Sequence, residues 1–158
     1  MADVKVGVVD VYPVERDGAG AWRVLLLERA NGARSAGAWE VVHGRMEPGE
    51  SPPAAARREL MEETGLTPAA LYVIASHPFY VAASDTVYLA VTFAALVDAT
   101  APIGLSGEHG AHRWLPFGEA AVRATWPRTE EHLRWIAKLL AAGDAGPAED
   151  VLRVPLTP

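Results

Sequence analysis

The stretch 44–66 reads GRMEPGESPPAAARRELMEETGL. A serine followed by prolines is typical of a helix start, because the serine hydroxyl caps free backbone N–H groups and proline loses nothing at the first helical position. Gly65 is well suited to the left-handed conformation that ends many helices. The sequence therefore predicts a helix over about residues 52–64, with Ser51 as its N-cap.

Three glutamates share one face of this predicted helix. At about 100° per residue, Glu59, Glu62 and Glu63 fall together at positions i, i+3 and i+4. Like charges at this spacing destabilise a helix by about 0.2–0.5 kcal/mol per pair. Two interpretations are open: a solvated face balanced by Arg57 and Arg58, or a face that binds a divalent metal ion.

The loop and the helix together fit one longer pattern, G-x5-E-x7-R-E-U-x-E-E-x-G-U, in which U is a bulky aliphatic residue. Its nine specified positions are all present, at Gly44, Glu50, Arg58, Glu59, Leu60, Glu62, Glu63, Gly65 and Leu66. This complete match favours the metal-binding interpretation. The pattern closely resembles the Nudix box, the signature of hydrolases that act on a nucleoside diphosphate linked to another group.

The resemblance implies a centre for Mg²⁺ or Mn²⁺, hard cations that prefer oxygen ligands. Carried over by position, the metal-binding set is Glu59, Glu62 and Glu63, with Glu63 as the firmest ligand. In relatives the backbone carbonyl before the box glycine is often a further ligand, which here is the carbonyl of His43. The imidazole of His43 has no assigned role.

Other residues of the predicted site come from the box and from beyond it. The resemblance implies that Gly44, Glu50 and Arg58 support the site, with Arg58 orienting a glutamate rather than touching phosphate. Relatives often add one acid from outside the box as a metal ligand or general base. Glu108, in the segment GLSGEHGAHRWL, is the candidate for this catalytic role, and Asp85 is a competitor that also suits a turn.

Aromatic and histidine side chains give a second set of candidates. Phe79 and Tyr80 lie in an expected loop over residues 77–85 that could overhang the site, where their rings would stack on a nucleobase. Trp39 could do the same, although aromatics beside strands usually fill the core. His109 and His112 are expected to be exposed or locally hydrogen-bonded loop residues.

Composition excludes several classes of protein. The 158 residues carry a net charge of −6 and no cysteine, which argues against a nucleic-acid polymer as partner and excludes disulfides and thiol chemistry. We expect a soluble, cytoplasmic protein that acts on small molecules, because the start of the chain lacks a secretory leader and no apolar run is long enough to cross a membrane. A homodimer is possible.

The remaining chain predicts a single α/β domain, a Nudix-type α/β/α sandwich with a central mixed sheet. Expected strands cover residues 4–14, 22–28, 39–42, 71–76, 86–96 and 111–115, and further helices cover residues 119–124 and 129–141. We assign residues 1–142 to the Nudix hydrolase domain. Residues 143–158 form a C-terminal tail that either packs as an extended arm or frays.

The predicted activity is Mg²⁺-dependent pyrophosphohydrolysis of a nucleoside or pterin triphosphate to the monophosphate and pyrophosphate. Glu-His followed by a Trp-Leu strand resembles the dihydroneopterin-triphosphate and dNTP pyrophosphohydrolase branch of the family. Three alternatives stay open: a nucleotide-sugar or dinucleotide-polyphosphate hydrolase, a non-catalytic nucleotide-binding module, and an acidic helix that binds calcium only for stability.

Overall fold

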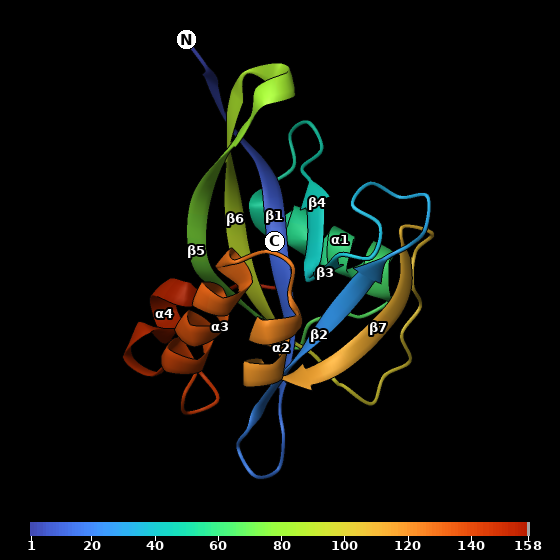
Figure 1. Cartoon of the computed structure of the whole chain (residues 1–158). Helices are drawn as coiled ribbons and strands as arrows, with labels where there is room; N and C mark the ends of the chain where they lie inside the picture. The colour runs from blue at the N-terminus through green and yellow to red at the C-terminus, as the bar shows by residue number, and fades with distance from the viewer. Residues whose placement is uncertain (158) are drawn as a thin grey trace.

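The computed structural model describes residues 1–157, which are built around one eight-stranded mixed sheet (Figure 1). Its strands are β1 Asp3–Arg16, β2 Trp22–Arg29, β3 Trp39–Glu40, β4 Val42–Arg45, β5 Ala70–Val81, β6 Thr86–Leu96, β7 His109–Pro116 and β8 Arg153–Val154. The order is β3-β2-β1-β6-β5-β8, with β4 beside β1 and β7 beside β2. Within residues 1–157, β1 and β6 pair in parallel, and the other strand pairs are antiparallel.

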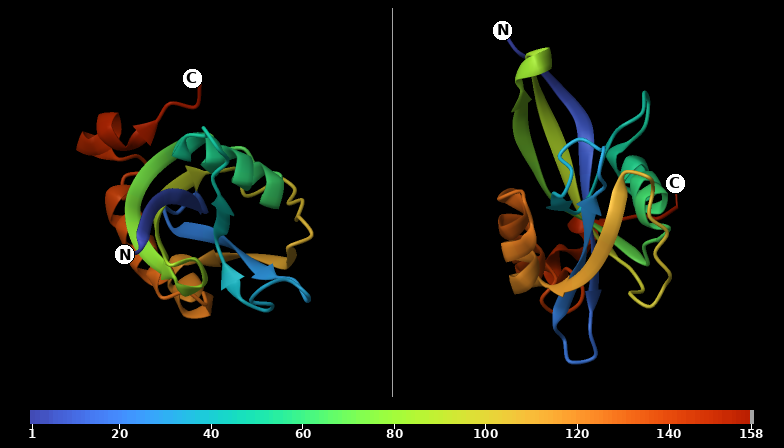
Figure 2. Two further views of the ribbon diagram at one scale, coloured as in Figure 1. Left: turned by 90° about the horizontal axis from the view of Figure 1, so that it is seen from above. Right: turned by 45° about the vertical axis from the view of Figure 1, so that its right-hand side comes forward.

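Helices cover both faces of the sheet (Figure 2). On one face, α1 (Pro52–Thr64) packs Ala55, Ala56 and Leu60 against the sheet. On the other face, α2 (Phe117–Arg123) and α3 (Arg128–Leu139) pack against a second apolar cluster that contains Leu133 and Ile136. The predicted α/β/α sandwich is confirmed.

The ends of α1 follow the chemistry of its flanking residues. The Ser51 hydroxyl accepts a hydrogen bond from the backbone N–H of Ala54 at 3.4 Å. Gly65 has φ of 74°, and its N–H donates to the Met61 carbonyl at 2.8 Å. Both expected caps are present, so the helix that carries the acidic face starts and ends where the sequence predicts.

Strand β1 has two partners in turn along one edge. Its C-terminal end pairs with β2, and residues 8–11 pair with β4, with Asp10 opposite His43. The expected single strand over residues 39–42 is therefore wrong. Strand β3 pairs with β2 and ends at Glu40; after Val41 the chain continues as β4, which pairs with β1 instead. This crossing from β2 to β1 places Gly44, the start of the box, on the sheet strand β4, which contacts α1.

Strand β5 is longer than expected and includes Phe79 and Tyr80, so their assignment to a loop is wrong. It forms a long hairpin with β6 that ends at the 3₁₀ turn Ala82–Ser84. Pro78 is tolerated because β8 pairs only with Leu71 and Tyr72, which leaves β5 an edge strand at position 78.

The C-terminal segment packs on the same sheet rather than fraying. A 3₁₀ turn (Gly146–Ala148) and the short helix α4 (Glu149–Leu152) lead into β8, which pairs with β5. Pro158, the last residue of the predicted tail, lies outside the described residues. Over residues 1–157, each helix is too short or too polar to cross a membrane.

Candidate active site

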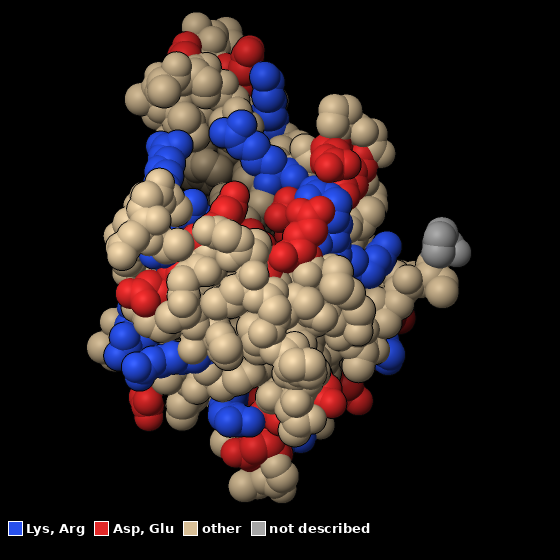
Figure 3. All heavy atoms as spheres, turned by 90° about the vertical axis from the view of Figure 1, so that its right-hand side faces the viewer, with Lys and Arg blue, Asp and Glu red and all other residues tan. Residues whose placement is uncertain are grey.

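A cavity of about 720 Å³ opens beside β4, and residues from the box and from strands β1, β5 and β6 line it. Charged side chains dominate its wall, with acids Glu40, Glu59, Glu62, Glu63 and Glu108 and cations Arg29, Arg34, Arg45 and Arg128. Figure 3 shows basic and acidic side chains gathered around this hollowed face. A cavity with both signs of charge suits a polyanion that is bound partly through a metal ion.

Gly44 allows the box helix to approach β4 closely. A Cβ atom added at this position would lie 2.0 Å from the Cδ atom of Glu59. No real side chain can occupy that space, so the glycine is required by the position of the Glu59 carboxylate. Gly44 thus leaves room for one of the predicted ligands, and its supporting role in the site stays a prediction that fits this contact.

Arg58 connects the loop of the box to the acidic face. Its guanidinium binds both carboxylate oxygens of Glu50 at 2.9 Å and donates to Glu59 at 2.7 Å and Glu62 at 3.3 Å. The hydrogen bonds to Glu50, followed by those to Glu59, raise the pKa of Arg58 further above its usual range. Arg58 is absent from the cavity wall, and its role in orienting a glutamate stays a prediction that fits these contacts.

Glu63 is the least satisfied acid of the site. Its carboxylate is buried, and Oε2 makes no hydrogen bond to any of residues 1–157. Burial, followed by the negative charges of Glu59, Glu108 and Glu40, raises the pKa of Glu63 to about 9. A buried acid among like charges is expected to gain a cation or keep its proton.

The residues present fit a hard divalent cation. Burial, opposed by Arg58, also raises the pKa of Glu59, so both buried box acids favour neutralisation. Over residues 1–157 no three His, Asp or Glu side chains already converge as a ligand set; Arg58 donates hydrogen bonds to Glu59 and Glu62. The backbone of His43 lies against Glu63 and opposes the rise in its pKa; the His43 carbonyl as a ligand stays a prediction.

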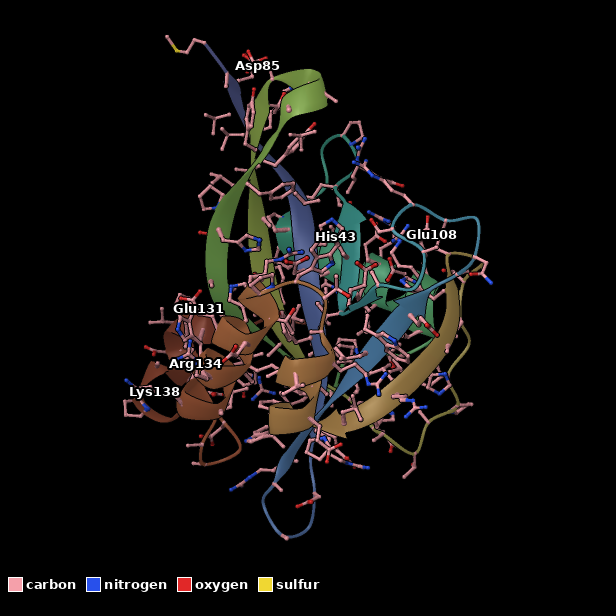
Figure 4. The ribbon with its side chains drawn as sticks, in the orientation of Figure 1. His43, Asp85, Glu108, Glu131, Arg134 and Lys138 are labelled. Atoms are coloured by element: carbon pink, nitrogen blue, oxygen red, sulfur yellow. The ribbon has the colours of Figure 1, made fainter. Side chains whose placement is uncertain are left out.

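The two acids considered beyond the box lie in very different places. Glu108 lines the cavity, and its charge acts on both Glu59 and Glu63. Asp85 lies at the far tip of the β5–β6 hairpin, well away from His43 and Glu108 (Figure 4). It has φ of 44° and accepts a hydrogen bond from Tyr80 at 2.8 Å. The geometry therefore supports Glu108 for the site and a turn role for Asp85.

Glu108→Gln should lower the rate constant kcat by about 10²-fold, the size expected for loss of a general base. Asp85→Asn is the matched control, because Asp85 is equally exposed and lies outside the cavity. Both rates would be measured at saturating Mg²⁺ and substrate. Unchanged turnover of a folded Glu108→Gln protein would remove Glu108 from the catalytic set.

Glu40 and His109 belong to the cavity region although the sequence pattern did not single them out for it. Glu40 accepts hydrogen bonds from Arg29 and Trp126 at 3.0 Å, and His109 lies 3.4 Å away. Burial alone would raise the pKa of Glu40, but these hydrogen bonds lower it to about 2. His109 is buried in β7, 3.9 Å from Glu63; the expectation of an exposed loop histidine is wrong for it.

Asp10 forms a second buried polar centre that sequence reasoning missed. It is fully buried and contacts His43 Nδ1 at 2.5 Å and Arg128 Nε at 3.1 Å. Burial raises the pKa of Asp10, but the bonds and charges of these two partners lower it to about 2. The available signal was a single acid inside the apolar run VGVVDVY, because such an acid needs buried partners.

The neighbouring aromatic candidates Phe79 and Tyr80 point to opposite faces of the sheet, because consecutive side chains of a strand alternate. Phe79 lines the cavity and stacks on Tyr88 of β6 with ring centroids 5.7 Å apart. Tyr80, the next residue, is absent from the cavity wall and is 57% exposed. Trp39 packs on the core beneath Arg123. His112, expected in a loop, lies exposed in β7.

Comparisons with known proteins identify the family of this chain. The family model for the NUDIX domain matches residues 3–139. A *Myxococcus xanthus* octanoyltransferase is 35% identical over 114 residues, which are 71% of this chain but 31% of that protein. The asymmetrical bis(5'-nucleosyl)-tetraphosphatase of *Sus scrofa* is 35% identical over 99 residues, covering 61% of this chain and 65% of its own. The chain thus spans about a third to two thirds of these relatives.

Two further matches bear on fold and family. The CTP pyrophosphohydrolase of *Escherichia coli* K12 is 41% identical over 64 residues, which are 40% of this chain and 44% of that protein. The crystal structure of a *Caenorhabditis elegans* Ap4A hydrolase binary complex superposes with a TM-score of 0.71 at 23% identity, covering 88% of this chain and 98% of the other. With the family match over residues 3–139 and the complete box, the chain belongs to the Nudix hydrolase family.

Proposed function

We propose that the protein is a Mg²⁺- or Mn²⁺-dependent pyrophosphohydrolase that cleaves a nucleoside or pterin triphosphate to the monophosphate and pyrophosphate. The observation that carries this proposal is Glu63, a buried carboxylate without a hydrogen-bond partner at Oε2, grouped with four further acids on the wall of the charged cavity. The acids suit a metal ion, and the arginines on the same wall suit phosphate oxygens.

In this proposal the protein supplies three things to the reaction. The carboxylates of Glu59, Glu62 and Glu63 would hold the metal ion, which when bound neutralises phosphate charge and orients the attacking water. Glu108, on the cavity wall, would accept the proton of that water. Arg45, the second residue of the box and the last of β4, would bind a phosphate oxygen outside the metal site.

The nucleoside part would lie on the sheet face formed by Phe79, Tyr88 and Val8. These side chains line the cavity, and they come from three neighbouring strands. Tyr88 lies over Gly7, where an added Cβ would be 3.2 Å from the tyrosine ring. An apolar, aromatic surface of this kind binds a base or pterin ring by stacking.

The test is a substrate panel assayed with Mg²⁺ and with EDTA. It should contain the common and oxidised dNTPs, NTPs, dihydroneopterin triphosphate, nucleotide sugars and dinucleoside polyphosphates. Pyrophosphate and a monophosphate are the expected products, in Mg²⁺ only. A folded wild-type protein that hydrolyses none of these compounds would favour a non-catalytic nucleotide-binding module instead.

A dinucleoside-polyphosphate hydrolase is the second candidate. The porcine tetraphosphatase, at 35% identity, is the specific observation that favours it. The panel separates the two candidates directly, because a triphosphate hydrolase releases pyrophosphate whereas an asymmetrical tetraphosphatase yields a triphosphate and a monophosphate. Comparison of kcat/KM for the two substrate types therefore decides between them.

Phe79→Ala should raise the KM for the best substrate about tenfold, with a smaller change in kcat, because one base–aromatic stack contributes about 1–3 kcal/mol. Tyr80→Ala is the matched control: it removes the neighbouring ring from the same strand, and its side chain lies outside the cavity wall. Steady-state kinetics of both variants test the assignment. Equal KM values for Phe79→Ala and wild type would place the base elsewhere.

A further inference from the structure

Arg128, a partly exposed residue of the cavity wall, forms an ion pair with the buried Asp10 behind it. Asp10 is fully buried in β1, at a position where its other close partners are His43 and, at 3.7 Å, His77. Arg128, the first residue of α3, donates its Nε–H to Oδ2, whereas His43 contacts Oδ1. A buried carboxylate is costly unless it is paired, so Asp10 holds its partners in fixed positions.

Arg128 keeps part of its guanidinium available to a ligand. The bond to Asp10 uses Nε, and neither terminal nitrogen is hydrogen-bonded to another of residues 1–157. The guanidinium carbon lies 5.7 Å from the centre of the Trp126 ring, and both residues line the cavity. The two terminal nitrogens therefore form a rigid fork of N–H donors at the cavity wall.

The fork lies close to the aromatic surface. His77 contacts Asp10 Oδ2, the same oxygen that accepts from Arg128, and its ring centroid is 6.3 Å from that of Phe79. Asp10 and His77 therefore connect Arg128 to Phe79, and Arg128 lines the same cavity as the Phe79–Tyr88 pair. A flat ring stacked on this pair would present an edge toward Arg128.

The charge of the pair favours a neutral ligand group over a phosphate. The Asp10 carboxylate lies 3.1 Å from the Arg128 Nε atom, so it offsets the positive charge of Arg128. Pairing with Asp10 weakens the attraction of Arg128 for a phosphate charge, but it keeps the N–H donors of Arg128 in a fixed geometry. Arg45 and Arg34, which line the same cavity without such a buried partner, are better suited to phosphate.

We propose that Arg128 is a specificity-determining residue that reads the edge of the nucleobase and selects bases with two adjacent acceptors. Guanine presents O6 and N7, the commonest arginine contact in base recognition, and cytosine presents O2 and N3. Adenine and uracil alternate donors with acceptors, so they satisfy only one arm of the fork. This inference rests on the proposed function for the location of the base, but it concerns binding and not turnover.

The test is calorimetric binding of GMP, CMP, AMP and UMP in the absence of metal. Wild type should bind GMP and CMP about tenfold more tightly than AMP and UMP, the discrimination that one bidentate contact gives. Arg128→Lys should reduce this ratio to about twofold, because lysine keeps the charge and loses the planar fork. Asp10→Asn, which loosens the positioning of Arg128, should reduce the ratio by an intermediate factor in any folded variant.

Arg134→Lys is the matched control, because it makes the same change on α3. Figure 4 shows Arg134 beside Glu131 and Lys138, away from His43 and Glu108. Its binding ratio should equal that of wild type. Equal affinity of wild type for all four nucleotides, including no binding of any, would overturn the proposal. So would a uniform loss across the four in Arg128→Lys, since that result identifies a phosphate contact.

The result is independent of the proposed activity. If wild type hydrolyses no compound of the panel but binds GMP and CMP preferentially, the proposed function fails and the role of Arg128 stands. If wild type hydrolyses triphosphates but does not distinguish these bases, the proposed function stands and the proposed role of Arg128 fails.

Discussion

Glu63→Gln should lower the rate of Mg²⁺-dependent hydrolysis by about 10³-fold, because the metal ion contributes several kcal/mol of charge stabilisation and each 1.36 kcal/mol is tenfold in rate. Glutamine keeps the size of the side chain but cannot carry the negative charge that a divalent cation needs. The measurement is kcat at saturating substrate over a titration of Mg²⁺. Arg57→Gln, on the same helix but outside the cavity wall, is the control.

Glu63 should also release a proton when the metal ion binds, and Glu63→Gln tests this. Because the pKa of Glu63 is about 9 in the metal-free protein, this carboxyl is protonated at pH 7, and metal binding should release close to one proton. Calorimetry in buffers of different ionisation enthalpy measures this release. In Glu63→Gln the contribution should vanish, and its persistence would show that another group carries the proton.

The free energy of unfolding of the metal-free protein should also depend on the titration of Glu63. The pKa of Glu63 is raised from 4.5 to about 9, so the folded metal-free protein binds this proton more tightly than the unfolded chain does. The free energy of unfolding therefore falls as pH rises through this window, and the contribution is fully present below pH 4.5. Thermal melts in EDTA should show a flatter pH dependence for Glu63→Gln than for wild type.

Gly44→Ala should lower kcat by about 10²-fold, the effect expected when a catalytic group moves by about 1 Å. The added Cβ would lie 2.0 Å from Cδ of Glu59, so the Glu59 carboxylate has to move away from its place in the acidic cluster. The Mg²⁺-dependent rise in melting temperature should shrink in parallel, because binding to the native state stabilises it.

Gly118→Ala gives the comparison for Gly44→Ala. Gly118 lies in α2, and a Cβ atom there would meet nothing within 4 Å. This variant should keep wild-type kcat and Mg²⁺ response. A Gly44→Ala protein with full activity would mean that Glu59 does not need its present position to support the reaction.

The parts of this protein that sequence predicts are those encoded locally. Ser51 and Gly65 act through hydrogen bonds and backbone conformation within a few residues, so the bounds of α1 were predictable. The acidic face follows from helical spacing alone. The family resemblance made Glu108, an acid outside the box, a further candidate, although the proximity of Glu108 to Glu63 depends on how β7 returns to the site.

The missed features depend on contacts between distant segments. Asp10 is opposite His43 only because β4 crosses to β1, and Arg128 reaches it from a helix 118 residues later. Glu40 acquires its role from Trp126 and Arg29. The extension of β5 through Phe79 depends on the length of β6 beside it, which no local pattern at position 79 encodes.

The parallel pairing of β1 with β6 has a consequence for the order of folding. Asp10 of β1 lies directly beside Thr92 of β6 in the sheet. A loop of about 80 residues must therefore close before this contact forms. During synthesis, the box helix is complete well before β6 leaves the ribosome. A chain that stops short of residue 86 therefore has every acid of the box but lacks Tyr88, and its surface for a nucleoside cannot yet exist.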